Sequence, residues 1–86
     1  MLAGLFTLLA LGCASSRQHT VLVFPYGNTA TIKDLKYTPG LIVMNDKRIT
    51  VPTCTSVKID LLQEDGHDQL SVWADDQLVV SLVERN

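Results

Sequence analysis

Beyond Arg17, apolar and polar side chains alternate with a period of two, and this alternation restricts the fold more than any other feature of the sequence. Residues 57–61 read Val-Lys-Ile-Asp-Leu, and residues 70–74 read Leu-Ser-Val-Trp-Ala. Successive side chains of a β-strand point to opposite faces of its sheet, so each segment can bury one face and leave the other in solvent. The pattern predicts an all-β domain, with no helix after the N-terminal segment.

Turn-forming residues separate these segments at intervals of about eight to twelve residues, a spacing typical of small all-β domains. Residues 25–28, 38–40 and 64–68 combine proline or acidic residues with glycine or asparagine, which accept positive φ. We expect about seven short antiparallel strands, in a small sandwich or barrel that occupies residues 20–86. The expected strands cover residues 20–24, 29–35, 41–44, 49–51, 57–61, 70–74 and 78–82.

Strand register can be argued at residues 41–51. A two-residue loop at 46–47 would pair Met44 with Ile49 and gather the apolar side chains on one face. A loop one residue earlier would place Val43 opposite Arg48. Because a slip of one residue moves every side chain to the other face, we prefer the first register.

The last two expected strands should form the most regular hairpin. A three-residue loop at 75–77 pairs Val72 with Val80 and Ala74 with Leu78, so one face of this hairpin is wholly apolar. Side chains on such a face are expected in the core of the domain.

Residues 1–12 form an uncharged apolar run, and the composition becomes polar immediately after Cys13. All seven basic and all nine acidic residues of the chain lie after Ser16. A helix needs roughly 20 residues to span a bilayer, whereas the apolar core of a signal peptide has about 7–15. We therefore expect residues 1–12 to be a signal peptide and residues 13–19 to be a linker.

The segment Leu9-Ala10-Leu11-Gly12-Cys13 resembles the lipobox of bacterial lipoproteins, in which a small residue precedes a cysteine that is lipidated and becomes the new N-terminus. Ala10 stands where leucine is usual, and residues 1–8 carry no positive charge. The resemblance covers about the first 16 residues. It implies a membrane anchor on Cys13 made of a diacylglyceryl group and an N-acyl chain, which meets the need of stable attachment for more than one chain.

The residue after the cysteine is Ala14 and not aspartate, which resembles the outer-membrane sorting pattern of enteric bacteria. This implies a lipid-anchored protein of the cell envelope, in the outer membrane and facing the periplasm. Three alternatives stay open for the N-terminus: an ordinary cleaved secretory signal, an uncleaved hydrophobic helix, and a buried core segment of a cytosolic protein.

Two residues are candidates for interaction with a partner. Cys54 is either a core thiol, since free cysteines are among the most buried residues, or a link to another chain in an oxidising compartment. A bond to Cys13 is the third alternative, and it requires that Cys13 carries no lipid. Trp73 falls on the less apolar face of the last expected hairpin. There it either covers a second sheet or remains exposed, as aromatic residues that anchor interfaces do.

No catalytic residue, metal site or cofactor is predicted. His67 lies among acidic residues, but a solvated acidic turn explains that cluster better than a metal or general-base site, and His19 is expected in the linker. The sequence contains no CxxC pair and no G-x-S-x-G motif. Acidic residues outnumber basic ones and the two are interspersed, whereas nucleic-acid-binding surfaces usually show a basic stripe.

These observations favour a non-enzymatic envelope lipoprotein whose β-domain binds another protein, as an accessory subunit of a larger complex. One alternative is a carrier or inhibitor that holds a small ligand between its sheets, although so short a chain leaves little volume for a pocket. Another is a phage- or plasmid-encoded lipoprotein that blocks a surface receptor.

Overall fold

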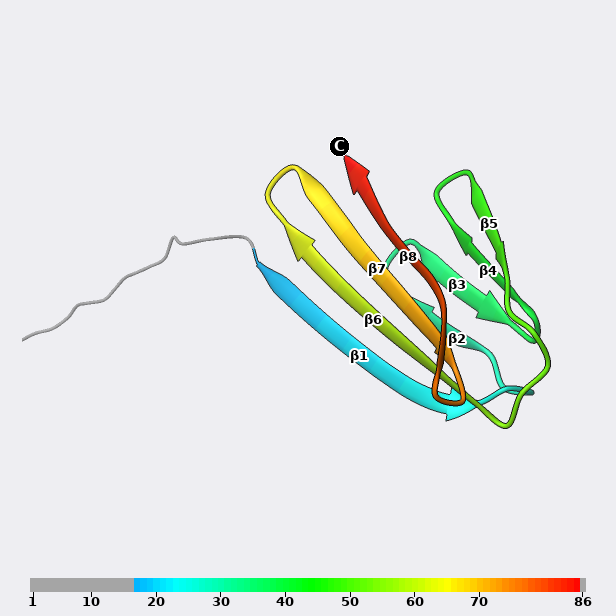
Figure 1. Cartoon of the computed structure of the whole chain (residues 1–86). Helices are drawn as coiled ribbons and strands as arrows, with labels where there is room; N and C mark the ends of the chain where they lie inside the picture. The colour runs from blue at the N-terminus through cyan, green and yellow to red at the C-terminus, as the bar shows by residue number, and fades with distance from the viewer. Residues whose placement is uncertain (1–16, 86) are drawn as a thin grey trace, which may run out of the picture.

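The computed structural model describes residues 17–85, which form eight antiparallel strands in two four-stranded sheets (Figure 1). The larger sheet has the order β1-β6-β7-β8 and consists of β1 (Gln18–Pro25), β6 (Ser56–Glu64), β7 (His67–Ala74) and β8 (Gln77–Arg85). The smaller sheet has the order β2-β3-β4-β5 and consists of β2 (Ala30–Ile32), β3 (Leu35–Thr38), β4 (Leu41–Met44) and β5 (Lys47–Thr50). The prediction of an all-β fold is confirmed. Residues 17–85 contain no helix long and apolar enough to cross a membrane.

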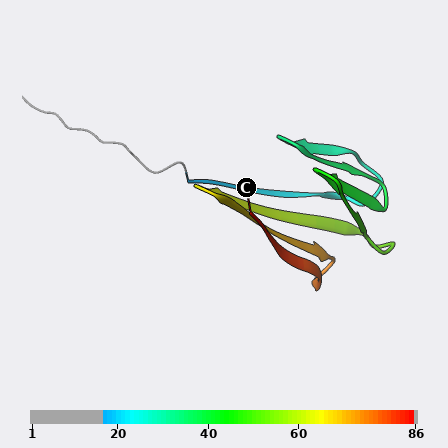
Figure 2. The same cartoon turned by 90° about the horizontal axis from the view of Figure 1, so that it is seen from above.

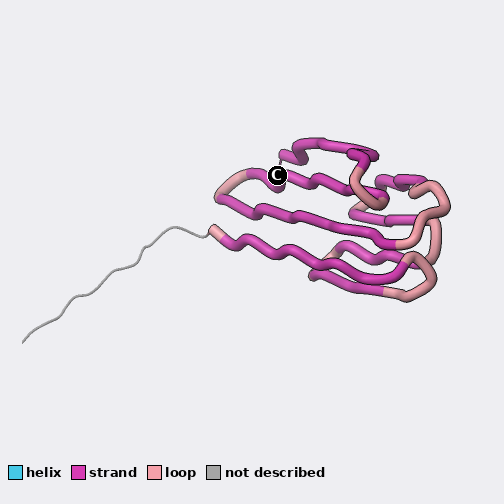
Figure 3. Tube along the Cα trace, turned by 60° about the horizontal axis from the view of Figure 1, so that its bottom comes forward, coloured by secondary structure: helices cyan, strands magenta, loops and turns pink. Residues whose placement is uncertain are grey.

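The core lies between the two sheets, whose stacking is visible in two views (Figures 2 and 3). Every buried side chain in the described part of the chain is hydrophobic. These residues are Ile32, Leu35, Tyr37, Ile42 and Met44 of the smaller sheet, Val57, Ile59, Leu61, Leu70, Val72 and Ala74 of the larger sheet, and Val51 between them. Burying one aliphatic side chain of this kind contributes about 1.5–3 kcal/mol, so this cluster is the main source of stability.

The segment 29–35, expected as one strand, is divided into β2 and β3 by a turn at Lys33 and Asp34. In one extended strand, Ile32 and Leu35 would point to opposite faces, because their positions differ by an odd number. The turn pairs Ile32 with Leu35 across two strands, and both side chains become buried in the core. Burial of both side chains therefore explains the additional strand, although Lys33 must adopt a φ of 50°.

The register that we preferred for β4 and β5 is wrong. The loop lies at residues 45–46, and Val43 is paired with Arg48. Asn45 opens this loop with a φ of 54°, a left-handed conformation that asparagine tolerates better than most residues. Val43 and Arg48 share the face of the smaller sheet that is turned away from the core, where a mixed pair costs little. In this register Val51 lies beyond β5 and is free to enter the core, where it is buried.

In the β7–β8 hairpin, the expected pairing of Val72 with Val80 is confirmed, but Ala74 is paired with Gln77 and not with Leu78. The loop has two residues instead of three, so β8 has one residue more than β7 between Leu78 and Val80. This extra residue, Val79, forms a β-bulge. Such a bulge adds one unpaired residue to one strand and restores the alternation beyond it.

The aspartate that opens this loop explains its length. The Asp75 carboxylate accepts hydrogen bonds from the backbone N–H groups of Thr55 and Ser56, at 3.2 and 3.1 Å. The N–H of Asp75 donates in turn to the carbonyl of Ser56 at 2.8 Å. These bonds tie the loop to the start of β6, and the bulge then adapts the rest of β8.

A buried hydroxyl connects three parts of the chain. The Tyr37 side chain, from β3, is fully buried and donates a hydrogen bond of 2.6 Å to the carbonyl of Tyr26, just after β1. The N–H of Gly40 donates to the same hydroxyl at 3.3 Å. Gly40 has a φ of 86°, and a Cβ at this position would lie 2.8 Å from the Tyr26 hydroxyl, so glycine is required here. The ring of Phe24 packs 4.9 Å from that of Tyr37.

We predict that Val72→Ala lowers the free energy of unfolding by about 1–3 kcal/mol, through lost burial and a residual cavity. The adjacent Ser71 lies on the opposite face of β7, so Ser71→Ala should be nearly neutral. Denaturant midpoints of the two variants check this. A larger loss for Ser71→Ala than for Val72→Ala would contradict the placement of the core.

We also predict that Tyr37→Phe destabilises the fold by about 1–3 kcal/mol, because it leaves a carbonyl and an N–H without their buried partner.

Burial raises the pKa of the Tyr37 phenol above its ordinary value. As the pH rises, the unfolded chain therefore loses the Tyr37 proton before the folded chain does. The free energy of unfolding should be highest below about pH 10 and should decrease at higher pH. Urea unfolding at neutral and alkaline pH should show a weaker alkaline loss in Tyr37→Phe. Tyr26→Phe is the control, since it keeps the backbone carbonyl that accepts from Tyr37. An equal loss of unfolding free energy in Tyr37→Phe and Tyr26→Phe would contradict the prediction.

Candidate functional site

The larger sheet has one face against the smaller sheet and one face turned away from it, which we call the outer face. Strand alternation places on the outer face every residue whose neighbours in the same strand point into the core. One row across the four strands consists of Val23, Lys58, Trp73 and Leu78, which are paired in that order. The next outer row consists of Val21, Asp60, Ser71 and Ser81.

The outer face carries all the large hydrophobic side chains that are exposed within residues 17–85. Val21, Val23, Leu78 and Val83 are 45%, 65%, 56% and 52% exposed. Isolated apolar side chains are ordinary on protein surfaces, whereas large apolar patches are typical of interaction sites, so the outer face is the candidate surface. The corresponding faces of the other strands show no such concentration in the described part of the chain.

Trp73 is half-buried on the outer face, so it does not cover the smaller sheet. The Nζ atom of Lys58 lies 4.8 Å from the centroid of the Trp73 ring. A cation over an aromatic face at an exposed site contributes about 0.5–1 kcal/mol, enough to orient the ring without burying it. Leu78, the pair of Trp73 on β8, lies at its other side. The indole therefore lies between a charged and an apolar neighbour and is open to solvent on part of its surface.

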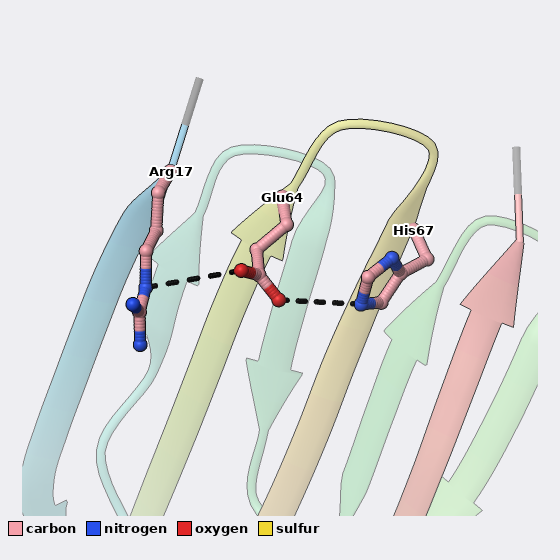
Figure 4. A network of polar contacts seen from close by, with 3 residues as sticks. All are labelled: Arg17, Glu64 and His67. Atoms are coloured by element: carbon pink, nitrogen blue, oxygen red, sulfur yellow. Dashed lines mark ion pairs between the residues drawn. The ribbon is translucent and has the colours of Figure 1, made fainter. Parts of the chain in front are cut away.

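Polar contacts occupy the end of the outer face where β1 begins. Figure 4 shows Glu64 between Arg17 and His67, with closest N–O distances of 4.0 Å to Arg17 and 3.3 Å to His67. Nε2 of His19 lies 2.7 Å from a carboxylate oxygen of Asp60. These groups are largely or partly exposed, and exposed ion pairs contribute only about 0–1 kcal/mol each. They connect side chains of β1, β6 and β7 at this end of the face.

The structure changes the placement of one histidine. His19 lies within β1, which begins at Gln18, and so it is not in the linker where we expected it. His67 contacts Glu64 on the neighbouring strand. No group of three or more His, Cys, Asp and Glu side chains within residues 17–85 is arranged to hold a metal ion.

Charge is distributed unevenly over the domain. Three of the seven basic residues and two of the nine acidic residues are on the outer face; they are Arg17, Lys58, Arg85, Asp60 and Glu64. The rest of the domain holds four basic and seven acidic residues. The outer face is thus the less acidic side of an acidic domain.

Cys54 is half-buried in the connection between β5 and β6 and packs against the hydrophobic core. Its thiol donates to the carbonyl of Ser56 at 3.4 Å, and it forms no disulfide within the described residues. An open hollow of about 450 Å³ lies beside it, lined by residues 52–54 and 74–77. Trp73 and Cys54 are therefore not parts of one site. Cys13, the predicted lipidation position, lies outside the described residues.

At the other end of the sandwich, a cavity of about 20 Å³ lies between the turns of the smaller sheet and the larger sheet. The side-chain oxygen of Gln63, one of its lining residues, is buried without a hydrogen-bond donor. This volume and this polar atom suit one water molecule.

The alternation of the sequence places Trp73 correctly on the outer face, but it does not identify Val21 and Val23 as exposed. Both are valines in an apolar run, and only the pairing of β1 with β6 decides which side chains of that run enter the core. Searches with this chain against protein-family models, curated proteins and solved structures find no match.

Proposed function

We propose that this chain is a lipid-anchored envelope protein whose β-domain binds a partner protein through the outer face of its larger sheet and performs no catalysis. The observation that carries the proposal is the gathering of Trp73 with all the exposed large hydrophobic residues of the described chain on one face. Aromatic residues in such settings provide much of the binding energy of protein interfaces.

The side chains of the outer face limit the kind of surface that a partner can present to it. Trp73 and its apolar neighbours require an apolar surface on the partner, and Lys58 beside the ring favours a carboxylate close to that surface. The excess of basic over acidic groups on this face favours the same partner. We therefore propose a protein with an apolar patch edged by acidic residues.

The anchor explains how so small a face can be sufficient. If Cys13 carries lipid, residues 13–18 connect the membrane to β1, and this segment reaches at most about 17 Å when fully extended. The domain then stays close to the bilayer, where a partner in the same membrane meets it at a high effective concentration.

The alternative of a small-ligand carrier has less support. Pockets for small molecules usually have about 300–1,000 Å³ and enclose most of the ligand, whereas the cavity between the sheets has about 20 Å³. The hollow of about 450 Å³ beside Cys54 is large enough, but it is open to solvent and does not lie between the sheets. The alternative of a lipoprotein that blocks a receptor differs only in the identity of the partner and would use the same face.

We predict that Cys13 is lipidated. Cells that express the full chain should incorporate a clickable fatty acid into it, and Cys13→Ser should abolish the label. Cys54→Ser, which removes the other cysteine of the chain, is the matched control and should keep the label. Equal labelling of wild type and Cys13→Ser, or no label in either, would contradict the anchor.

We predict that Trp73→Ala weakens partner binding by about 2 kcal/mol or more, as expected for an aromatic anchor. In membranes of cells that express the full chain, a photo-reactive amino acid in place of Leu78 should give one discrete adduct with a second protein. The same amino acid in place of Lys36, on the exposed side of the smaller sheet, should not.

Trp73→Ala should reduce the Leu78 adduct more than tenfold while circular dichroism shows an intact fold. Adducts of equal yield from Leu78 and Lys36, or a Leu78 adduct that Trp73→Ala does not reduce, would argue against the outer face as the binding surface.

A further inference from the structure

Within residues 17–85, each of the two sheets has two edge strands, namely β1 and β8 in the larger sheet and β2 and β5 in the smaller one. An edge strand presents unpaired N–H and C=O groups to any chain that can add a strand to the sheet. Natural proteins block this addition with short strands, charged residues, prolines or bulges at their edges. The four edges can therefore be compared by whether such a device is present.

Three of the four edges carry a blocking device. β2 has only three residues. β5 begins with Lys47 and Arg48, both exposed. β8 is interrupted by the bulge at Val79, which bends the strand and breaks its regular pairing.

β1 carries none of these devices along its centre. It has eight residues and pairs with β6 in one unbroken register from Gln18 to Pro25. Residues 20–24 are uncharged, and Val21 and Val23 are among the most exposed hydrophobic residues of the domain. Proline occurs only at the last position, where it limits the length of the edge without blocking its middle.

The backbone of β1 is suited to a further strand. The N–H of Tyr26 donates to the carbonyl of Thr55 on the β6 side. In an antiparallel pair these groups point alternately towards the partner and away from it. The N–H and C=O groups of His19, Val21 and Val23 therefore point to the free edge. The carbonyl of Pro25 agrees with this alternation, because it accepts a hydrogen bond from Asn28, outside the ladder.

We propose that β1 pairs antiparallel with β1 of a second copy of this chain, about a two-fold axis at Leu22. Val21 of each copy then lies opposite Val23 of the other, and the two residues exchange backbone hydrogen bonds. His19 lies opposite Pro25, so the axis brings no like charges together. Leu22 of each copy meets its equivalent on the inner side, where it is already packed against the core.

The second copy is favoured over an unrelated strand because Val21 and Val23 can exchange backbone hydrogen bonds with their counterparts, and because their apolar side chains and the lack of like charges match. The Pro25 end adds no bonds, since proline has no N–H and its carbonyl is bonded to Asn28. The pairing would join two larger sheets into one, with both outer faces on the same side, and it leaves Trp73 free. It does not depend on the anchor or on the partner proposed above, although tethering in one membrane would strengthen it.

Disulfide trapping in cell membranes tests the pairing. Two differently tagged copies of the full chain, both with Cys54→Ala, carry Val21→Cys and Val23→Cys respectively. Opposed residues of a hydrogen-bonded pair have Cα atoms about 5.5 Å apart, within the range of a disulfide. Mild oxidation should link them in high yield. The control uses Leu78→Cys and Val83→Cys on β8, which are similarly exposed; equal yields from both pairs, or none from the β1 pair, would overturn the proposal.

The mass of the full chain in mild detergent provides the second test. Sedimentation equilibrium should give a dimer for wild type. Val21→Lys should raise the dimer dissociation constant by about tenfold or more, since each copy brings an uncompensated ammonium group to the interface. Val83→Lys should leave the constant unchanged. A monomer for wild type at every concentration would overturn the proposal, and so would equal effects of Val21→Lys and Val83→Lys. A dimer of Cys13→Ser would support the pairing even if the lipid anchor were disproved.

Discussion

The hydroxyl of Tyr37 is the contact on which the arrangement of the two sheets depends. It accepts from Gly40, in the turn between β3 and β4 of the smaller sheet, and donates to the carbonyl that follows β1 of the larger sheet. Apolar contacts favour burial but are not directional, so many relative positions of two sheets would bury a similar area. A hydrogen bond between a buried donor and a buried acceptor tolerates few of them, because any other position leaves polar groups unpaired. This bond therefore selects one packing among those that the core would allow.

The period of two was sufficient to predict the fold class and most of the strands, because alternation follows directly from strand geometry. The departures arise where a second demand competes with alternation. At Lys33 the need to bury both Ile32 and Leu35 forces a turn on a residue with no turn preference. In β8, the two-residue loop held by Asp75 would shift the pairing with β7 by one residue and turn the apolar side chains away from the core. The bulge at Val79 restores the pairing of Val72 with Val80 while the short loop is kept. Such compromises depend on contacts between distant segments, which a local pattern does not contain.

The candidate site was predictable to a smaller extent. Alternation within β7 places Trp73 on the face away from the core. The exposure of that face depends on the absence of a covering layer within residues 17–85, which only the sheet arrangement reveals. The contact between Lys58 and the indole depends on the register of β6 with β7. Tyr37 had no signal in the sequence, since a tyrosine in a short strand is as often exposed as buried.

The pairing of β1 with β6 also sets the order in which the domain can fold. Gln18 is paired with Gln63, and the whole smaller sheet lies between these strands in the sequence. Closing so long a loop is slow compared with forming the β6–β7 and β7–β8 hairpins, which are local in sequence. The first strand of the domain to leave a ribosome or a translocation channel is therefore among the last to find its place. Until then the apolar side chains of β1 lack their neighbours in the sheet, and a chaperone that binds extended apolar segments would find one in β1.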